Sequence, residues 1–539
     1  MTGIRGWLAI AGLVALALVG TVVQPSVASI DNVWSTSPSP RLVSGRSSHA
    51  SRSSAQAILD SIDSTSSSKA VNANVKIPTP ETHWIEQPVD HFNARDKRKW
   101  KQRFLVTTEM WKPNKTTNLS GPIFVYTGGE AEITHYWNTA GFVYELARDF
   151  GALVVMAEHR YYGQSWPFGT AKDSLTQDNI GYLSSIQALS DYAALIYHVF
   201  DEWKVTPDTP VLTIGGSYAG MMAAWMRLRY AHIVDAAYAS SAPILIAGQG
   251  YPHPYISPYS YFARVAQDYQ AADLSCPINI RAGFTALLAA FNSGSQSALE
   301  QVKTDLNLCN TPSSSDADFL VQWARQAYVS LAQSDYAYAN GNWPAWPVDA
   351  ACATLKSIVR TGGALKGMGA VMAMAYGDGS NSCLDPTKLF RPCADQTGCG
   401  FGDDADAWDY QACTEIVYFM SSNNKTDVFP PSQWTLDTLT QYCKDRWDVI
   451  PNPDFIGIEF GGKDITDSFH LIFTNGELDP WAVGGVQFDL GPEIVALNYE
   501  KGAHHADLNT PSTGDPDSVR TVRDKVKKHI QQYLFHTRP

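Results

Sequence analysis

The stretch TIGGSYAGMMAAW, residues 213–225, decides which fold this chain adopts. Gly215 and Gly220 flank Ser217 in a pattern similar to G-x-S-x-G, and the segment before them, TPVLTI, is typical of a short strand. The segment after them, MMAAWMRLRY, is typical of a helix. A serine on a tight turn between strand and helix is exposed at the edge of an α/β sheet, where it can act as a nucleophile. The alternative is a glycine-rich turn with an incidental serine.

A serine hydroxyl needs a base, and two late loops supply candidates. HLIFTNGELDP places Asp479 just after a predicted strand, and NYEKGAHHADL places His504 and His505 just after the next. The order Ser217, Asp479, His504, with each residue at the C-terminal end of a strand, is the order of α/β hydrolases. Alternatively, Asp479 is a plain turn residue before a proline, and the histidines lie on a solvated loop. The joint occurrence in the right order favours a catalytic triad.

The rest of the chain predicts an α/β fold made of two parts. In residues 79–244 the strand-like stretches GPIFVYTGGE, GALVVMAEHRYYG and DTPVLTIGG alternate with helical runs, which indicates a parallel sheet covered on both faces. Residues 245–455 are mostly helical and contain every cysteine. Residues 456–539 return to strands and end in an amphipathic helix, DSVRTVRDKVKKHIQQYLF. We therefore expect an α/β-hydrolase sheet domain with an inserted, disulfide-stapled helical cap.

The N-terminus predicts a secretory route. Residues 1–28 have a basic start, an apolar core and a small-residue cleavage site, as in a signal peptide, and residues 29–78 form a Ser-rich linker or pro-segment. A membrane anchor is the alternative, but the apolar run is short, so we expect no stable membrane insertion after cleavage. Asn114, Asn118 and Asn424 begin glycosylation sequons. The expected location is extracellular, lysosomal or vacuolar.

Charge and cysteine content narrow the functional classes. The chain has 539 residues and a formal net charge of −13, which argues against a nucleic-acid partner. In a secreted chain, an even number of cysteines indicates disulfides, and their spacing does not fit a metal site, so we expect no metal and no cofactor. The sequence fixes neither the pairing nor the oligomeric state, and a homodimer stays open. The eight cysteines are Cys276, Cys309, Cys352, Cys383, Cys393, Cys399, Cys413 and Cys443.

Several long motifs resemble one family, that of lysosomal Pro-X carboxypeptidase and dipeptidyl peptidase II, serine exopeptidases that cleave after proline. They are QPVDHFN (87–93), QRFLV (102–106), PIFVYTGGE (122–130), AEHRYYGQSWPFG (157–169), GGSYAGMMAAW (215–225), NGELDPW (475–481) and GAHHADL (502–508). The resemblance implies the triad Ser217, Asp479 and His504, the first histidine of the pair. It also implies a helical cap inserted after the nucleophile strand.

The fold predicts an oxyanion hole near Ser217. One donor is the backbone N–H of Tyr218, and the second comes from the turn after the first strong strand, at Gly129 or Glu130. That turn departs from the family's usual T-G-N-E-G-D at three positions, which puts recognition of the substrate end in doubt. The charged residues of AEHRYYG are expected to form a structural ion pair among themselves rather than line the site.

The two branches of the family predict different reactions. CADQTGCG, AWDYQACTEI and SSNNKTDVFP resemble dipeptidyl peptidase II, whereas Glu477 in NGELDPW resembles the carboxypeptidase. Release of N-terminal X-Pro dipeptides (or, more loosely, cleavage after alanine) requires a carboxylate that binds the substrate's α-amine. Asp395 is the candidate, and Glu130 and Glu132, near the oxyanion turn, are the alternative anchors. Pro-X carboxypeptidase activity is the second hypothesis; an esterase or lipase, or a non-catalytic binding protein, is more distant.

Overall fold

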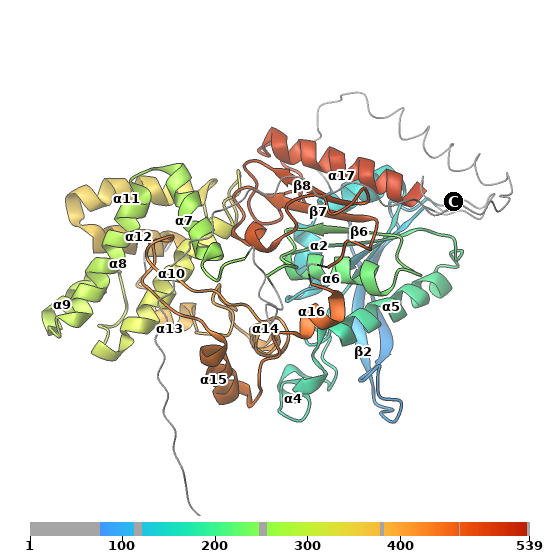
Figure 1. Cartoon of the computed structure of the whole chain (residues 1–539), viewed down its shortest axis with the longest axis horizontal. Coiled ribbons are helices and arrows are strands. Elements are labelled where there is room, and N and C mark those ends of the chain that lie inside the picture. Colours follow the sequence, from blue (N-terminus) through green and yellow to red (C-terminus); the bar gives the residue numbers. More distant parts are fainter. Residues whose placement is uncertain (1–75, 113–120, 247–255, 378–381, 463, 536–539) are drawn as a thin grey trace, which may run out of the picture. The chain divides into compact units, whose positions relative to one another are not determined.

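The structure is a computed structural model that describes residues 76–112, 121–246, 256–377, 382–462 and 464–535 (Figure 1). The predicted signal peptide, nearly all of the Ser-rich segment and the sequons at Asn114 and Asn118 lie outside these residues. Asn424 lies within them and is exposed. In the part of the chain that the structure describes, none of the helices has the length and apolar character that a membrane crossing requires.

Eight strands form one mixed sheet in the order β1-β2-β4-β3-β5-β6-β7-β8. The first two strands are antiparallel to each other and β2 is antiparallel to β4, whereas all later pairs are parallel. Parallel strands bring their C-terminal ends to one edge, where open α/β sheets build their sites. The strands are β1 (Glu81–Pro88), β2 (Lys99–Thr107), β3 (Ile123–Thr127), β4 (Leu153–Ala157), β5 (Val211–Gly216), β6 (Ala236–Ser240), β7 (Leu471–Gly476) and β8 (Ile494–Tyr499).

The central strands β3 to β7 are buried on both faces, as expected for the inner strands of a covered parallel sheet. In β3, Ile123 and Val125 belong to one hydrophobic core, and Phe124 and Tyr126 belong to the other. Helices α5 and α6 pack in the first core, and α2, α3 and α17 pack in the second. Their bounds are α2 (Ile133–Thr139), α3 (Phe142–Phe150), α4 (Ala171–Ser174), α5 (Ser185–Glu202), α6 (Ser217–Arg229) and α17 (Asp517–Phe535).

A helical block occupies the chain between β6 and β7 (Figure 1). It consists of α7 (Ser260–Ala272), α8 (Cys276–Asn292), α9 (Gln296–Asp305), α10 (Ala317–Gln333), α11 (Pro347–Gly362), α12 (Ala364–Tyr376), α13 (Pro386–Leu389), α14 (Asp403–Thr414), α15 (Leu436–Trp447) and α16 (Phe455–Phe460). Four disulfides staple it: Cys276–Cys352, Cys309–Cys383, Cys393–Cys399 and Cys413–Cys443. The predicted fold class is thus confirmed: an α/β-hydrolase sheet with a stapled helical insertion. The limits 245–455 stay a prediction.

Candidate active site

Ser217 lies on the turn between β5 and α6 with a φ of +57°, the left-handed backbone expected of a strained nucleophile. The turn is so tight that a Cβ on Gly215 would come within 2.1 Å of the Ala219 carbonyl oxygen. The exact spacing is G-x-S-x-A-G, because Ala219 stands two residues after the serine where a strict G-x-S-x-G pattern has glycine. Alanine fits there because it sits in the first turn of a helix.

Asp479 and His504 are brought together at the ends of β7 and β8. The Nδ1 atom of His504 lies 2.9 and 3.0 Å from the two carboxylate oxygens of Asp479, and both side chains are buried. Asp479 is fixed in turn because its Oδ1 accepts a hydrogen bond from the backbone N–H of Trp481. Among the described residues, the Nε2 atom of His504 has no hydrogen-bond partner. The imidazole is therefore oriented on one side and available as a base on the other.

His505, the other histidine of the pair, has a different environment. Its ring packs against that of His504 at 4.5 Å between centroids, and its backbone N–H donates to Ser241 Oγ. Burial lowers the pKa of His505 to about 3, and the neighbouring imidazole adds to the effect. His505 is therefore neutral, and the structure gives it no hydrogen bond to Asp479.

Ser217 opens into a cavity of 390 Å³ formed jointly by the sheet end and the helical block. Glu130 and Tyr218 line it from the sheet side, and Asp395 and Trp408 line it from the helical block. His504 is not among the residues that line the cavity, and no hydrogen bond joins it to Ser217 within the described residues. The cavity therefore contains most of the predicted site residues, but the hydrogen bond between the serine and the base is not formed.

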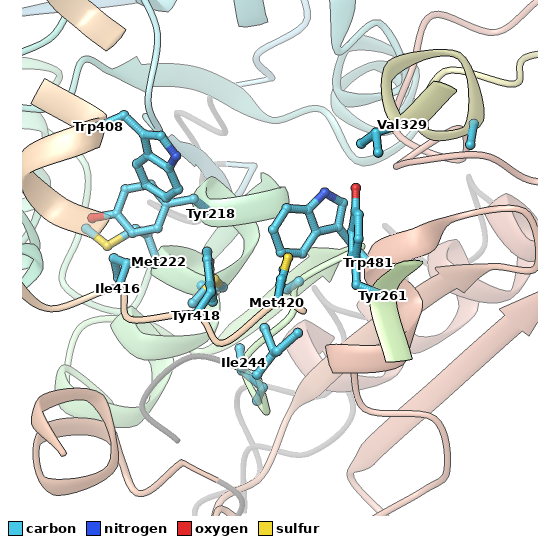
Figure 2. Packing of buried hydrophobic residues seen from close by; sticks show 14 of the residues in the cluster. Tyr218, Met222, Ile244, Tyr261, Val329, Trp408, Ile416, Tyr418, Met420 and Trp481 are labelled. Carbon is cyan, nitrogen blue, oxygen red and sulfur yellow. The ribbon is translucent and has the colours of Figure 1, made fainter. Parts of the chain in front are cut away.

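Aromatic side chains make up part of the lining of this cavity. The ring of Tyr218 lies 5.2 Å from that of Trp408, and the ring of Tyr418 lies 5.4 Å from that of Trp481. Figure 2 shows these pairs with Met420 and Ile244 packed close by. Flat apolar walls of this kind suit a compact apolar ring such as proline.

Two carboxyl groups lie in the cavity, and burial raises the pKa of both. Asp395 accepts hydrogen bonds from the backbone N–H and hydroxyl of Thr397 and from the indole N–H of Trp408. The disulfide Cys393–Cys399 closes the loop that carries it. In Glu130, by contrast, the Oε2 atom is buried without a hydrogen-bond partner among the described residues.

The predicted oxyanion donors lie around the nucleophile. Helix α6 begins at Ser217, so the backbone N–H of Tyr218 is among the first N–H groups of the helix, which have no intrahelical partner. Gly129 lies against this helix start: a Cβ on it would be 3.3 Å from the Ala219 nitrogen and 2.8 Å from the Tyr136 hydroxyl. The hydroxyl of Tyr218 is held by His159 and by Gln411 of the helical block.

The charged residues of AEHRYYG have a structural role, but the expected partners are wrong. Glu158 pairs with Arg103 on β2, at 2.5 Å, and Arg160 pairs with Asp191 on α5, at 2.7 Å. All four side chains are buried. Neighbours along a loop after a strand point apart, so each buried charge finds its counter-ion on another element.

Sequence reasoning missed several cavity residues of the helical block. Gln326, Ser330 and Gln333 line the cavity from one side of α10. Their spacing of four and three residues, which places them on one side of the helix, was the available signal. Arg391 also lines the cavity; its Nη1 donates to Asp406 at 2.8 Å, whereas its Nε and Nη2 are buried without a partner in the described part of the chain.

Comparisons with known proteins identify the family of this chain. The family model "Serine carboxypeptidase S28" matches residues 87–526. The chain is 36% identical to the lysosomal Pro-X carboxypeptidase of Pongo abelii and 35% identical to that of Homo sapiens, in each case over 459 residues, or 84% of this chain and 88% of the relative. It is 27% identical to the thymus-specific serine protease of Mus musculus over 469 residues, again 84% of this chain and 88% of the relative. The chain therefore belongs to the S28 family of serine peptidases.

Proposed function

We propose that this protein is an exopeptidase that cleaves after proline, using Ser217 as nucleophile, His504 as base and Asp479 as the group that orients the base. The observation that supports it best is the cavity at Ser217, with its aromatic walls and its two buried carboxyl groups. The bond between His504 and Asp479, with Nε2 left available, supports the same roles.

The reaction follows from these positions. The Ser217 Oγ attacks the carbonyl carbon after proline while His504 Nε2 accepts the hydroxyl proton. The N–H of Tyr218, together with that of Gly129 or Glu130, stabilises the negative oxygen. The protonated imidazole gives its proton to the leaving amine, and water then releases the acyl group by the same route. Bound substrate must bring Ser217 and His504 into contact, since catalytic hydrogen bonds often form only in the complex.

The favoured reaction releases an N-terminal X-Pro dipeptide, with the proline ring between the aromatic walls. A dipeptide's protonated amine lies a fixed distance from the scissile bond, and a carboxylate in a partly desolvated cavity binds it strongly. Asp395 is the proposed anchor, because it is buried, rigidly held and open to the cavity that contains Ser217. Glu130, with an unpartnered oxygen, is the second carboxyl group within the same cavity.

Pro-X carboxypeptidase activity is the second candidate, and two observations favour it. The curated relatives described above at 35% and 36% identity bear that name. Arg391 also lines the cavity, and two of its guanidinium nitrogens are buried with no hydrogen-bond partner among the described residues. A guanidinium is suited to bind a substrate's terminal carboxylate. The names of these relatives, together with the predicted signal peptide, support a lysosomal or vacuolar location; the extracellular alternative is also retained. An esterase of the same fold is the remaining alternative.

Hydrolysis of two substrates side by side tests the proposal. One is an X-Pro amide with a free N-terminus, and the other is an N-blocked peptide ending in Pro-X. We expect the enzyme to release the dipeptide from the X-Pro amide. This cleavage should be lost when the N-terminal amine of that substrate is acetylated. Cleavage of the second alone would move the protein to carboxypeptidase activity, and cleavage of neither, with rapid ester hydrolysis, would contradict the whole proposal.

A further inference from the structure

The helical block touches the loop of His504 through the backbone of that residue. The backbone N–H of His504 donates to the carbonyl oxygen of Gln333, at 3.1 Å, and the hydroxyl of Tyr336 donates to the carbonyl oxygen of His504, at 2.9 Å. Tyr336 and His504 are both buried. Both peptide groups that flank the proposed base are thus bonded to the insertion and not to the sheet: one to Gln333, the last residue of α10, and the other to Tyr336, three residues after it.

The same end of α10 also reaches the loop of Asp479. The side-chain oxygen of Gln333 accepts a hydrogen bond from the indole N–H of Trp481, at 3.3 Å. The backbone N–H of Trp481 in turn donates to Asp479. The end of α10 is therefore bonded directly to His504 and, through Trp481, indirectly to Asp479.

Helix α10 is also part of the cavity wall, where a peptide would lie. Gln326, Ser330 and Gln333 all face the cavity that contains Ser217. Gln333 thus lines the cavity with its side chain and holds His504 with its carbonyl group. Because helices are stiff along their axis, a peptide that seats against this wall acts on an element already bonded to the base.

We propose that Tyr336 is a positioning residue for His504, and that the end of α10 aligns the base with Ser217 when a peptide fills the cavity. The inference rests on the triad proposed above. Tyr336 does not itself touch the reacting atoms; it fixes the carbonyl group of the residue that does. The helical insertion is then part of the catalytic framework, in addition to forming one side of the cavity.

The ring of Tyr336 has a separate structural role. The test must therefore distinguish loss of this packing from loss of the hydrogen bond to His504. The ring stacks on Tyr338 at 5.5 Å and packs in a cluster with Tyr499, Ala503 and Val519. Tyr336→Phe keeps this packing and removes only the bond to His504. Tyr328→Phe is the matched control, since Tyr328 lies on α10 with a buried hydroxyl that has no hydrogen-bond partner among the described residues.

The experiment measures kcat and KM for the substrate that the wild type cleaves, the rate at which a small fluorophosphonate labels Ser217, and the melting temperature. Tyr336→Phe should lower kcat by about tenfold with KM nearly unchanged, as the loss of one buried hydrogen bond felt in the transition state predicts. Labelling should slow by a similar factor, and the downfield proton resonance of the His504–Asp479 bond should shift. Tyr328→Phe should leave all of these at wild-type values.

Wild-type kcat and labelling in a folded Tyr336→Phe protein would overturn the inference, as would a change confined to KM. Equal losses in Tyr336→Phe and Tyr328→Phe would also overturn it, because they would indicate a general effect of α10 packing. The proposed function fails by a different result: full turnover in His504→Ala would remove the triad itself.

Discussion

At the scale of single residues, His504 and His505 differ in ways that a substitution can measure. Ser217→Ala and His504→Ala should each lower kcat on the order of 10⁶-fold, because triad members act as a unit. His505→Gln should retain most turnover, since His505 is neutral and has no hydrogen bond to Asp479 in the structure. The measurements are kcat and fluorophosphonate labelling. Loss of activity in His505→Gln with retention in His504→Ala would show that the base is misassigned.

Asp395 and Arg391 form a second measurable pair, because they lie in one cavity with opposite charges. For an X-Pro amide, Asp395→Asn should cost ~2–5 kcal/mol in kcat/KM, as expected when one partner of a buried charge pair is truncated. Arg391→Gln should leave that substrate unaffected, and labelling of Ser217 should be normal in both variants. The opposite outcome is that Arg391→Gln lowers kcat/KM for peptides ending in Pro-X. That result would show that the cavity binds the carboxylate end of the substrate.

At the scale of elements, Asp335 joins two helices and makes stability depend on pH. It follows α10, it is buried, and its Oδ1 accepts a hydrogen bond from the Val348 N–H in the first turn of α11. Burial raises the pKa of Asp335 to about 7. The folded protein therefore keeps the proton on Asp335 up to about pH 7, whereas the unfolded chain releases it above about pH 4. The stabilisation that this proton gives the folded state is complete below about pH 4 and is lost as the pH rises to 7.

We therefore expect the melting temperature to fall between pH 5 and 7.5. Asp335→Asn keeps the acceptor oxygen but does not titrate. Across this pH range the free energy of unfolding of the variant should change by about 1–3 kcal/mol less than that of the wild type. Burial also raises the pKa of Glu415 to about 7, so Glu415→Gln should reduce the slope further. Calorimetry across this range is the measurement, and a wild-type melting temperature that rises with pH would contradict the sign.

Elements with a strong local pattern were predictable, and elements shaped by tertiary contacts were not. The strands β3, β4, β5, β7 and β8 have apolar or β-rich runs, so periodicity identified them. Strand β6, AAYAS, has no β-branched residue and is a strand because it is buried between β5 and β7. The proposed triad positions Ser217, Asp479 and His504 were inferred from chain order and strand ends, and they stay a proposal. The cavity's polar wall on α10, and the bond from Tyr336 to His504, depend on how helices pack, which no local pattern encodes.

At the scale of the whole molecule, the four disulfides of the helical block close loops of different lengths. Cys276–Cys352 links α8 to α11 across 76 residues, whereas Cys393–Cys399 spans 6. In the chain-entropy model the long loop contributes ~4.5 kcal/mol and the short one ~2 kcal/mol. Replacing Cys276 and Cys352 by serine should therefore lower the melting temperature more than replacing Cys393 and Cys399. The second change should instead alter substrate specificity, because its loop carries Asp395.

Thiol titration of the denatured, unreduced protein provides a separate check on the pairing. All eight cysteines are paired in the structure, so the expected reading is zero thiols per chain. Two or more reactive thiols would contradict a fully oxidised block.

The position of the insertion has a consequence for how the enzyme is made. Strand β6 pairs in parallel with β7, so Ala237 has no partner until Leu471 has been synthesised. At 5–20 residues per second, a ribosome needs roughly 10–50 s to synthesise the roughly 230 residues between them. During that time the proposed nucleophile Ser217 has left the ribosome, whereas the proposed base His504 has not been synthesised, and β6 lacks its partner strand β7. On the proposed triad, the nascent chain is therefore inactive as a peptidase until β7 and the loop of His504 have emerged, and the unpaired edge of β6 is open to wrong pairing until then.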